Sequence, residues 1–334
     1  MKKLLFVFLA VVLVMSVFAG GGGQQKAPAA QQKITLKWAE LLGPDYVTTV
    51  AAKKLAEHVS KKSDGRITIE IYDSMVLGDE KSTMQSVQMG AVDFFRGSAL
   101  TTGDFGAKKM NVLGLPFVFS SNEHLWKVLE SNIGKEILDN VQQSGSKMVG
   151  VGFFGEGSRH FFFTKKEVKT LADFKGLKIR VPQTQLMMDM VDALGANATP
   201  ISYSELYSAL QTGVVDGAEN ALPSYYSNSF YEVAKYVVRS YHSFSAYPIL
   251  ASEITWGKLS AADKAIIAEG LDVAREWNKK EAAKADSDAY NALISRGVVI
   301  NDTNLAEWQA SVGPVYRKYA ADYMNILDAI QKMK

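Results

Sequence analysis

Residues 175–220 read KGLKIRVPQTQLMMDMVDALGANATPISYSELYSALQTGVVDGAEN and decide the fold. The apolar alternation over 178–181 predicts a short strand, which ends at Pro182 because proline cannot donate to a β-ladder. Apolar residues then recur at helical spacing and predict a helix that stops at Gly195. These residues are Leu186, Met187, Met190, Val191 and Leu194.

The rest of the stretch predicts two more strands with a helix between them. Residues 198–201 are short and extended, and the S-x-x-E pattern of Ser202 and Glu205 predicts a capping box at the start of the next helix. That helix should end at Gly213, and residues 214–218 should return as a strand. The order strand, helix, strand, helix, strand is half of an open α/β sheet.

Polar residues gather at the predicted carboxyl ends of these strands, where open α/β sheets bind their ligands. Arg180 ends the first strand, Thr199, Ser202 and Tyr203 lie at the end of the middle one, and Asn220 lies just beyond the last. A permanently charged, forked donor at such a place suits a carboxylate or a phosphate. The alternative for Arg180 is a structural ion pair at the surface or between lobes.

Residues 34–95 repeat the same order of strand, helix, strand, helix and strand. A short sequence repeat marks the correspondence, since QMGAVD at 88–93 matches QTGVVD at 211–216. Each copy reads as a helix end, a glycine stop and a strand that carries Val-Asp. We therefore expect two similar α/β lobes, and the crevice between two such lobes is a common ligand site.

Later segments should cross between the two lobes, which would make both lobes discontinuous. We expect an apolar crossing segment at 111–119, a strand-like segment at 147–154 followed by a loop at 155–159, and another crossing at 245–254. A helix from about 260 to 295 should span both lobes. Lobe I would then comprise 33–156 plus 246–286, and lobe II 157–245 plus 287–334.

The segments KGLKIRVP and LGANATPISYSELYSALQTGVVDGAEN resemble the signature of the DctP-like periplasmic solute-binding proteins of TRAP (tripartite ATP-independent periplasmic) transporters. The similarity runs from about Ile34 to the C-terminal helices. It implies an α/β, two-lobed periplasmic-binding-protein fold (type II-like), in which each lobe is a mixed sheet flanked by helices and the ligand cleft lies between them. It also implies a protein that closes on an organic acid and delivers it to the membrane permease subunits.

The resemblance implies ligand-binding roles for four residues of the second lobe. It places Arg180 as the clamp on the ligand carboxylate, and it places Arg159, within GEGSRHFFFT, as a second arginine that reaches the ligand. It assigns Asn220 to the ligand as well. Tyr203 stands where the family packs an aromatic ring against the ligand body.

In the first lobe the resemblance implies contacts around Glu40, at the end of strand one, and near Ser98, at the end of strand three. Some family members carry an acidic residue at the latter place, whereas this chain has Ser98 flanked by Arg96. We therefore expect Glu40 and Glu80 to accept hydrogen bonds from ligand hydroxyls. A further set could wall the cleft or simply fill the core; it consists of Trp38, His242, Phe244 and Tyr247.

Composition excludes several classes of function. The 334 residues can hold two ordinary domains, and 37 basic residues face 35 acidic ones, so no basic field calls for nucleic acid. Cysteine is absent, which excludes disulfides, thiolate zinc sites and cysteine nucleophiles. We expect no cofactor, no metal and a monomer.

The N-terminus predicts export. Lys2 and Lys3 precede an apolar run over 4–19, which is typical of a secretory signal peptide cleaved near Ala19; a retained membrane anchor is the alternative. Residues 20–32 are a low-complexity linker. The expected location is the periplasm.

No catalytic machinery is visible. The G-x-G-x-x-G at 150–155 matches the dinucleotide fingerprint, but an aromatic strand segment follows where a helix should open. The four histidines are scattered, and neither H-E-x-x-H nor G-x-S-x-G occurs. The alternative functions are an exported sugar-acid lyase or isomerase, with Glu40, Glu80 and His242 as acid–base candidates, and a signalling receptor domain. The acid itself stays open among sugar acids such as uronates, dicarboxylates and 2-oxo acids.

Overall fold

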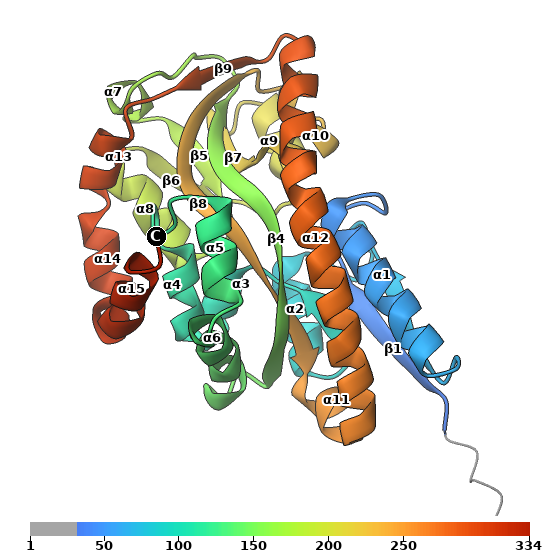
Figure 1. Ribbon diagram of the computed structural model, residues 1–334. Helices are drawn as coiled ribbons and strands as arrows, with labels where there is room; N and C mark the ends of the chain where they lie inside the picture. The colour runs from blue at the N-terminus through green and yellow to red at the C-terminus, as the bar shows by residue number, and fades with distance from the viewer. Residues whose placement is uncertain (1–31) are drawn as a thin grey trace, which may run out of the picture. The chain divides into compact units, whose positions relative to one another are not determined.

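One mixed sheet organises residues 32–334, the part of the chain that the computed structural model describes (Figure 1). The strand order is β2-β1-β3-β8-β4-β7-β5-β6, with β9 paired to β8. The strands are β1 (Ile34–Ala39), β2 (Ile67–Tyr72), β3 (Phe94–Arg96), β4 (Met148–Phe163), β5 (Lys178–Val181), β6 (Asn197–Pro200), β7 (Gly217–Ala221), β8 (Tyr236–Ser252) and β9 (Val299–Asp302).

The helices flank this sheet. They are α1 (Val47–Lys62), α2 (Glu80–Gln88), α3 (Ala99–Asp104), α4 (Asn111–Gly114), α5 (Asn122–Leu129), α6 (Asn132–Gln143), α7 (Leu171–Phe174), α8 (Gln185–Ala193), α9 (Leu206–Gln211), α10 (Leu222–Ser227), α11 (Glu253–Lys258), α12 (Ala261–Ser295), α13 (Leu305–Ser311), α14 (Gly313–Tyr319) and α15 (Met324–Gln331).

Two long strands, β4 and β8, run through both halves of the sheet. They pair antiparallel from Met148–Ser252 at one end to Phe163–Tyr236 at the other. The first half adds β3, β1 and β2 to one end of this ribbon, and the second half adds β7, β5 and β6 to the other. The predicted loop at 155–159 is wrong, because β-bulges absorb the glycines there while the ladder continues.

The QMGAVD and QTGVVD repeat has a structural meaning. Asp93 accepts a hydrogen bond from the backbone N–H of Lys37 in β1 at 2.7 Å, and Asp216 accepts one from Lys178 in β5 at 2.8 Å. Each aspartate therefore links the first strand of its half of the sheet to the segment just before the third strand of that half. The predicted strands began three residues too early in both copies, since β3 starts at Phe94 and β7 at Gly217.

The capping box expected at Ser202 and Glu205 is also wrong. The two side chains hydrogen-bond to each other, and α9 begins only at Leu206 after a turn. A box does form at the long helix α12, where the Ser260 side chain accepts from the backbone of Asp263 and the Asp263 carboxylate accepts in return. The predicted helix over 260–295 is confirmed.

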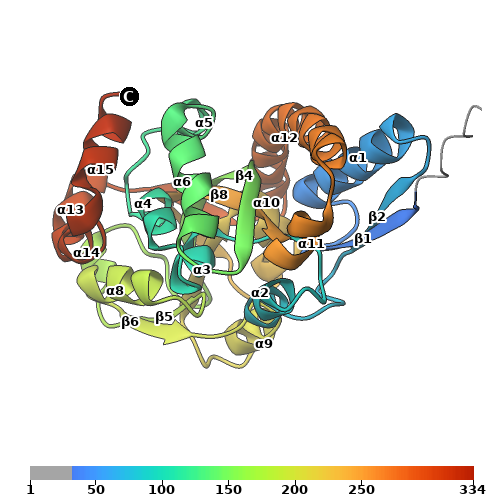
Figure 2. The same ribbon diagram turned by 90° about the horizontal axis from the view of Figure 1, so that it is seen from below.

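Helix α12 contacts both halves of the sheet. It packs on α1 of the first half and on α10 of the second, and it lies along β4 between them (Figures 1 and 2). Asn278 of α12 accepts a hydrogen bond from the backbone N–H of Gly155 at 2.7 Å, next to the β4 bulge. The helix therefore supports the segment where the chain passes from one half to the other.

Aromatic side chains fill the core on each half. Trp38 stacks on Phe94 and lies near Phe154 under α1 and α12, while Phe161 and Trp308 stack in the second half. Burial of side chains of this size is the main source of stability in either half.

The C-terminal segment contains three short α-helices, α13, α14 and α15. Pro314 lies in the first turn of α14, where proline is tolerated, whereas it is not tolerated inside a helix. Tyr319 of α14 donates to Asp189 of α8 at 2.6 Å, and His124 of α5 bonds the Ile330 carbonyl of α15 at 2.9 Å. The segment thus contacts elements of both halves.

The predicted signal peptide and nearly all of the predicted linker lie outside the described residues. Within residues 32–334, no helix combines the length and the apolar character needed to cross a membrane.

A substitution at Gly155 tests how tightly β4 is packed where it passes between the two halves of the sheet. A Cβ there would lie 2.8 Å from Cζ2 of the buried Trp126, so Gly155→Ala should destabilise by about 1–3 kcal/mol through overpacking. Gly257→Ala in α11 is the matched control, because nothing lies within 4 Å of its Cβ. Urea unfolding should show a lower midpoint for the first variant and an equal or slightly higher one for the second. Equal midpoints for both would contradict this packing.

Candidate ligand-binding site

A cavity of about 250 Å³ lies between the two halves of the sheet. The carboxyl ends of β1, β3, β5 and β6 open toward it, as expected for an open α/β sheet. Eight residues proposed from the sequence for the strand ends or the cleft wall line this cavity: Glu80, Ser98, Arg159, Arg180, Ser202, Tyr203, Asn220 and Tyr247. At its edge, Asp104 of α3 accepts a hydrogen bond from the backbone of Gln185 in α8 at 3.2 Å, so the two halves touch there.

Arg180, in β5, is a buried cation of this cavity. It is 2% exposed, and its one hydrogen bond to a described residue runs from Nε to the carbonyl of Ile201 at 2.9 Å. No carboxylate of residues 32–334 lies within ion-pair distance of it. Its guanidinium carbon lies 5.7 Å from the ring centre of Tyr203.

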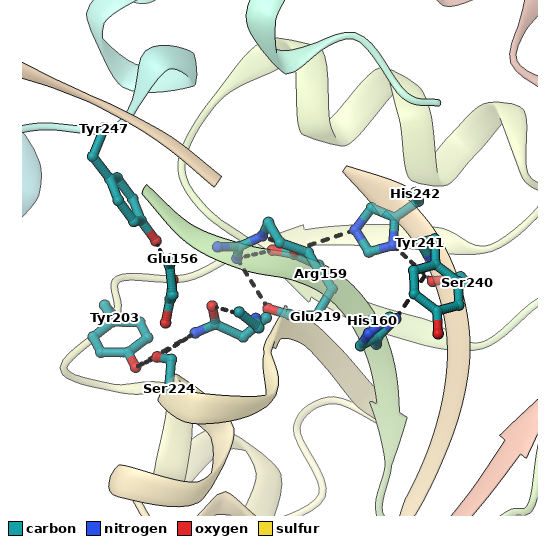
Figure 3. A network of polar contacts seen from close by, with 12 residues as sticks. Glu156, Arg159, His160, Tyr203, Glu219, Ser224, Ser240, Tyr241, His242 and Tyr247 are labelled. Carbon is teal, nitrogen blue, oxygen red and sulfur yellow. Dashed lines mark hydrogen bonds and ion pairs between the residues drawn. The ribbon is translucent and has the colours of Figure 1, made fainter. Parts of the chain in front are cut away.

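Arg159 also lines the cavity, but Glu219 already neutralises it (Figure 3). Its Nε lies 2.6 Å from Glu219 Oε2 and its Nη2 lies 2.9 Å from Oε1, a bidentate pair. The two residues lie on the adjacent antiparallel strands β4 and β7. This pairing fixes the guanidinium and leaves its Nη1 edge free of bonds to described residues.

His242 supports Glu219 from behind and does not line the cavity (Figure 3). Its Nε2 donates to Glu219 Oε2 at 3.3 Å, and its Nδ1 accepts from Ser240 at 2.8 Å. Burial holds the pKa of His242 below its ordinary value, so the ring is neutral at neutral pH. The Arg159 cation and these hydrogen bonds outweigh burial at Glu219 and hold its pKa well below the usual range.

Arg96 is a cavity-lining cation that sequence reasoning noted only as a neighbour of Ser98. It ends β3, and its Nε donates to Glu40 Oε1 at 2.7 Å, with Nη2 on the same oxygen. Its guanidinium lies over the ring of Tyr247, 4.3 Å from the centre. Glu40 therefore lies behind Arg96 and not at the cavity surface. The signal available in the sequence was the position of Arg96 at a strand end, the same position that marked Arg180.

Arg180 and Arg96 are about equally buried, and their pKa values show the effect of a neighbouring carboxylate. Burial lowers the pKa of Arg180 to about 10. At Arg96 burial acts in the same direction, but the Glu40 carboxylate and Tyr247 outweigh it and leave the pKa above its ordinary value. Both groups are charged at neutral pH, and only Arg96 has an ion-pair partner among the described residues.

Asn220 and Tyr203 form a polar cluster with Ser224, which the sequence did not single out. The Tyr203 hydroxyl lies 2.6 Å from the Ser224 hydroxyl, and Asn220 Nδ2 donates to Ser224 at 2.9 Å. Asn220 lies within β7 and not beyond it. The cluster positions an amide, a phenol and a hydroxyl on one wall of the cavity.

On the other wall, Glu80 and Ser98 are joined, because Glu80 Oε1 accepts from the Ser98 backbone N–H at 2.8 Å. The Ser98 hydroxyl caps α3 by accepting from Thr101 at 3.1 Å. Of the four residues proposed as cleft wall or core, only Tyr247 lines the cavity, and Trp38 and Phe244 belong to the core.

Glu156 is a buried carboxyl next to the cavity that sequence reasoning missed. It lies between Tyr247 and Tyr203, and Tyr247 donates to its Oε2 at 2.6 Å (Figure 3). Its Oε1 has no partner among the described residues. Burial raises its pKa to about 7, although Tyr247 and Arg159 act in the opposite direction.

No metal site accompanies these groups within residues 32–334, where no three His, Asp or Glu side chains gather in a suitable arrangement. The cavity is therefore lined by fixed hydrogen-bond donors and acceptors, with one excess buried cation. Such a cavity can bind a small organic anion.

Comparison with known proteins agrees with this geometry. A sequence profile of the family described as bacterial extracellular solute-binding protein, family 7 (DctP), matches residues 38–322. A TRAP periplasmic solute-binding protein from Pseudomonas putida F1, solved with D-glucuronate bound, is similar with a TM-score of 0.87 and 31% identity over 89% of this chain and 97% of that chain. One from a Bradyrhizobium species, in complex with D-galacturonate, has a TM-score of 0.86 and 32% identity over 89% and 99%.

Among curated relatives, the C4-dicarboxylate-binding periplasmic protein DctP of Rhodobacter capsulatus is 29% identical over 298 residues, which are 88% of this chain and 88% of that protein. Fold and cavity together define the class, which is a two-lobed solute-binding protein. More particularly, the chain belongs to family 7 of the bacterial extracellular solute-binding proteins, the DctP family. The predicted family and the predicted two-lobed α/β fold are confirmed.

The buried carboxyl of Glu156 should make stability depend on pH. Its pKa is about 7 when folded and about 4.3 when unfolded, so between these values the unfolded chain binds fewer protons and stability falls as pH rises. The loss should be on the order of 3 kcal/mol between pH 4 and pH 8. Glu156→Gln should remove this contribution, as measured by urea unfolding across that range. Exposed Glu57→Gln is the control, and parallel profiles for wild type and Glu156→Gln would contradict the assignment.

Proposed function

We propose that this protein is the extracytoplasmic solute-binding subunit of a TRAP transporter. It binds a sugar acid, in the first place a uronate, between its two lobes and delivers the acid to the membrane permease. The observation that carries the proposal is Arg180, a buried arginine without a carboxylate partner in residues 32–334. Burying an uncompensated charge is costly, and a ligand carboxylate is the group that removes this cost.

The rest of the cavity supports a hydroxylated acid. Asn220, Tyr203 and Ser224 on one wall and Glu80 on the other can donate to and accept from several hydroxyls. A volume of about 250 Å³ suits a small metabolite. The relatives solved with D-glucuronate and D-galacturonate support a uronate as the first ligand to test.

The contacts between the halves support closure on the ligand. Arg180 belongs to the second half, Glu80 belongs to the first, and Asp104 already bonds Gln185 across the edge of the cavity. A ligand that contacts both lobes stabilises the closed form by its differential affinity for that form. The closed form is the one that we expect the permease to recognise, with the binding protein acting as a monomer.

We also propose that the protein is not an enzyme. The three acid–base candidates considered from the sequence do not act together, since Glu40 pairs with Arg96 and His242 pairs with Glu219 behind the cavity surface. Only Glu80 of the three lines the cavity. This arrangement supports binding over general acid–base catalysis, which needs a positioned acid and base at the ligand.

Arg180→Ala should weaken uronate binding by about two to three and a half decades, because removing one member of a desolvated ion pair costs roughly 3–5 kcal/mol. Titration calorimetry with D-glucuronate and D-galacturonate, on protein unfolded and refolded to remove any bound acid, measures the loss. Arg317→Ala, at an exposed position of α14, is the control and should bind as wild type does. Unchanged affinity in Arg180→Ala would remove Arg180 as the anchor.

Export should leave a mature chain that begins close to Gly20. Expression in a bacterial host followed by periplasmic extraction and N-terminal sequencing tests this. A chain that keeps its first residues and fractionates with the membrane would instead favour the anchored receptor.

A further inference from the structure

Two arginines line the cavity from opposite halves of the sheet, and they differ in their counter-charges. Arg180, from β5, has no carboxylate partner in the described part of the chain. Arg96, from β3, is held by Glu40, and both residues are almost completely buried, with exposed fractions of 3% and 1%. The second half of the cavity therefore offers an uncompensated positive charge, and the first half offers a neutralised one.

The geometry around Arg96 leaves it able to donate hydrogen bonds. Its Nε and Nη2 bond Oε1 of Glu40, and that oxygen also accepts from the backbone N–H of Leu41 at 3.1 Å. The Tyr247 ring supports one face of the guanidinium. The Nη1 edge has no bond to a described residue, so it can donate to an oxygen of the ligand.

The other charged groups of the first half make this end of the cavity unfavourable for an anion. Asp79, Glu80 and Asp104 line it as carboxylates, and Lys81 is the single additional cation, at an exposed position where solvent screens it. A second carboxylate placed at this end would find Arg96 already paired and other carboxylates nearby.

From these observations we propose that Glu40, by neutralising Arg96, makes the cavity select acids with one carboxylate over acids with two. Arg180 takes the single carboxylate, and Arg96 donates to an uncharged oxygen at the far end of the ligand, such as a hydroxyl or a ring oxygen. Glu40 is thus a specificity-determining residue that acts through Arg96 without touching the ligand. The inference rests on the proposed function and narrows its substrate class.

The test compares D-gluconate with D-glucarate, which share an open six-carbon chain and differ by a second carboxylate in place of a terminal hydroxymethyl group. D-Glucuronate serves as a cyclic monoanion of the same size. Dissociation constants are measured by calorimetry at one pH and one ionic strength. The measured quantity is the ratio of the glucarate constant to the gluconate constant. If gluconate binds too weakly to measure, glucuronate replaces it in the ratio. The difference between a cyclic and an open-chain acid affects this ratio equally in every protein variant, so it cancels when the variants are compared.

Wild type should bind glucarate at least tenfold more weakly than the monoanion. Glu40→Gln frees the charge of Arg96 and should lower the ratio at least tenfold. Arg96→Gln leaves the charge of Glu40 uncompensated and should raise the ratio of the two dissociation constants. The double variant should return this ratio toward the wild-type value, with weaker binding of both acids. Glu57→Gln, which changes net charge equally at an exposed position, should leave the ratio unchanged.

A wild-type preference for glucarate, or a ratio that Glu40→Gln does not move, would overturn the inference. Thermal unfolding shows whether each variant is folded. If Glu40→Gln is not folded, two other results test the inference. The ratio of dissociation constants should rise in Arg96→Gln, and it should fall back toward the wild-type value in the double variant. The proposed function fails separately, if wild type binds none of the three acids or if Arg180→Ala binds them all as well as wild type does.

Discussion

The antiparallel pairing of β4 with β8 is the interaction on which the rest of the structure depends. Because both strands run through both halves of the sheet, one ladder carries two α/β units and keeps their strand ends around one cavity. The same ladder supplies cavity residues itself, since Arg159 lies on β4 and Tyr247 lies on β8. Bulges in β4 and support from α12 occur where the ladder passes between the halves. These two strands and one helix are the elements that any closing motion has to bend.

Buried charge is the second constraint, and it separates the two cavity arginines that have a carboxylate partner, Arg96 and Arg159, from Arg180. Glu40 and Glu219 each neutralise an arginine inside the protein, so neither pair requires anything from solution. Arg180 is equally buried and is left without such a partner in the described residues. In the function that we propose, a ligand anion supplies the missing interaction and thereby favours the closed form.

Much of this could be predicted from the sequence, because local signals carried it. Alternation, helical spacing and glycine stops located most strands and helices, and the Val-Asp repeat identified two equivalent units, whose aspartates make equivalent hydrogen bonds. The errors arose where tertiary contacts override local preference. The glycines at 155 and 157 suggest a loop in isolation, whereas pairing with β8 keeps them in a strand. The third strands begin later than their valines suggest, because the preceding aspartates turn back to the first strands.

By itself the sequence determined the family, the two-unit α/β fold and the likeness of Arg180 to a carboxylate clamp, since these depend on residue type and spacing. Only the tertiary structure decided which charged residues reach the cavity. Glu40 and Arg96 are far apart in sequence, as are Glu219 and His242. No local pattern indicates that Glu40 and Glu219 each bind an arginine of the cavity wall. The physical reason is that the role of a charged side chain depends on the groups that lie next to it in space. The same glutamate contacts a ligand or neutralises an arginine according to what folding places beside it.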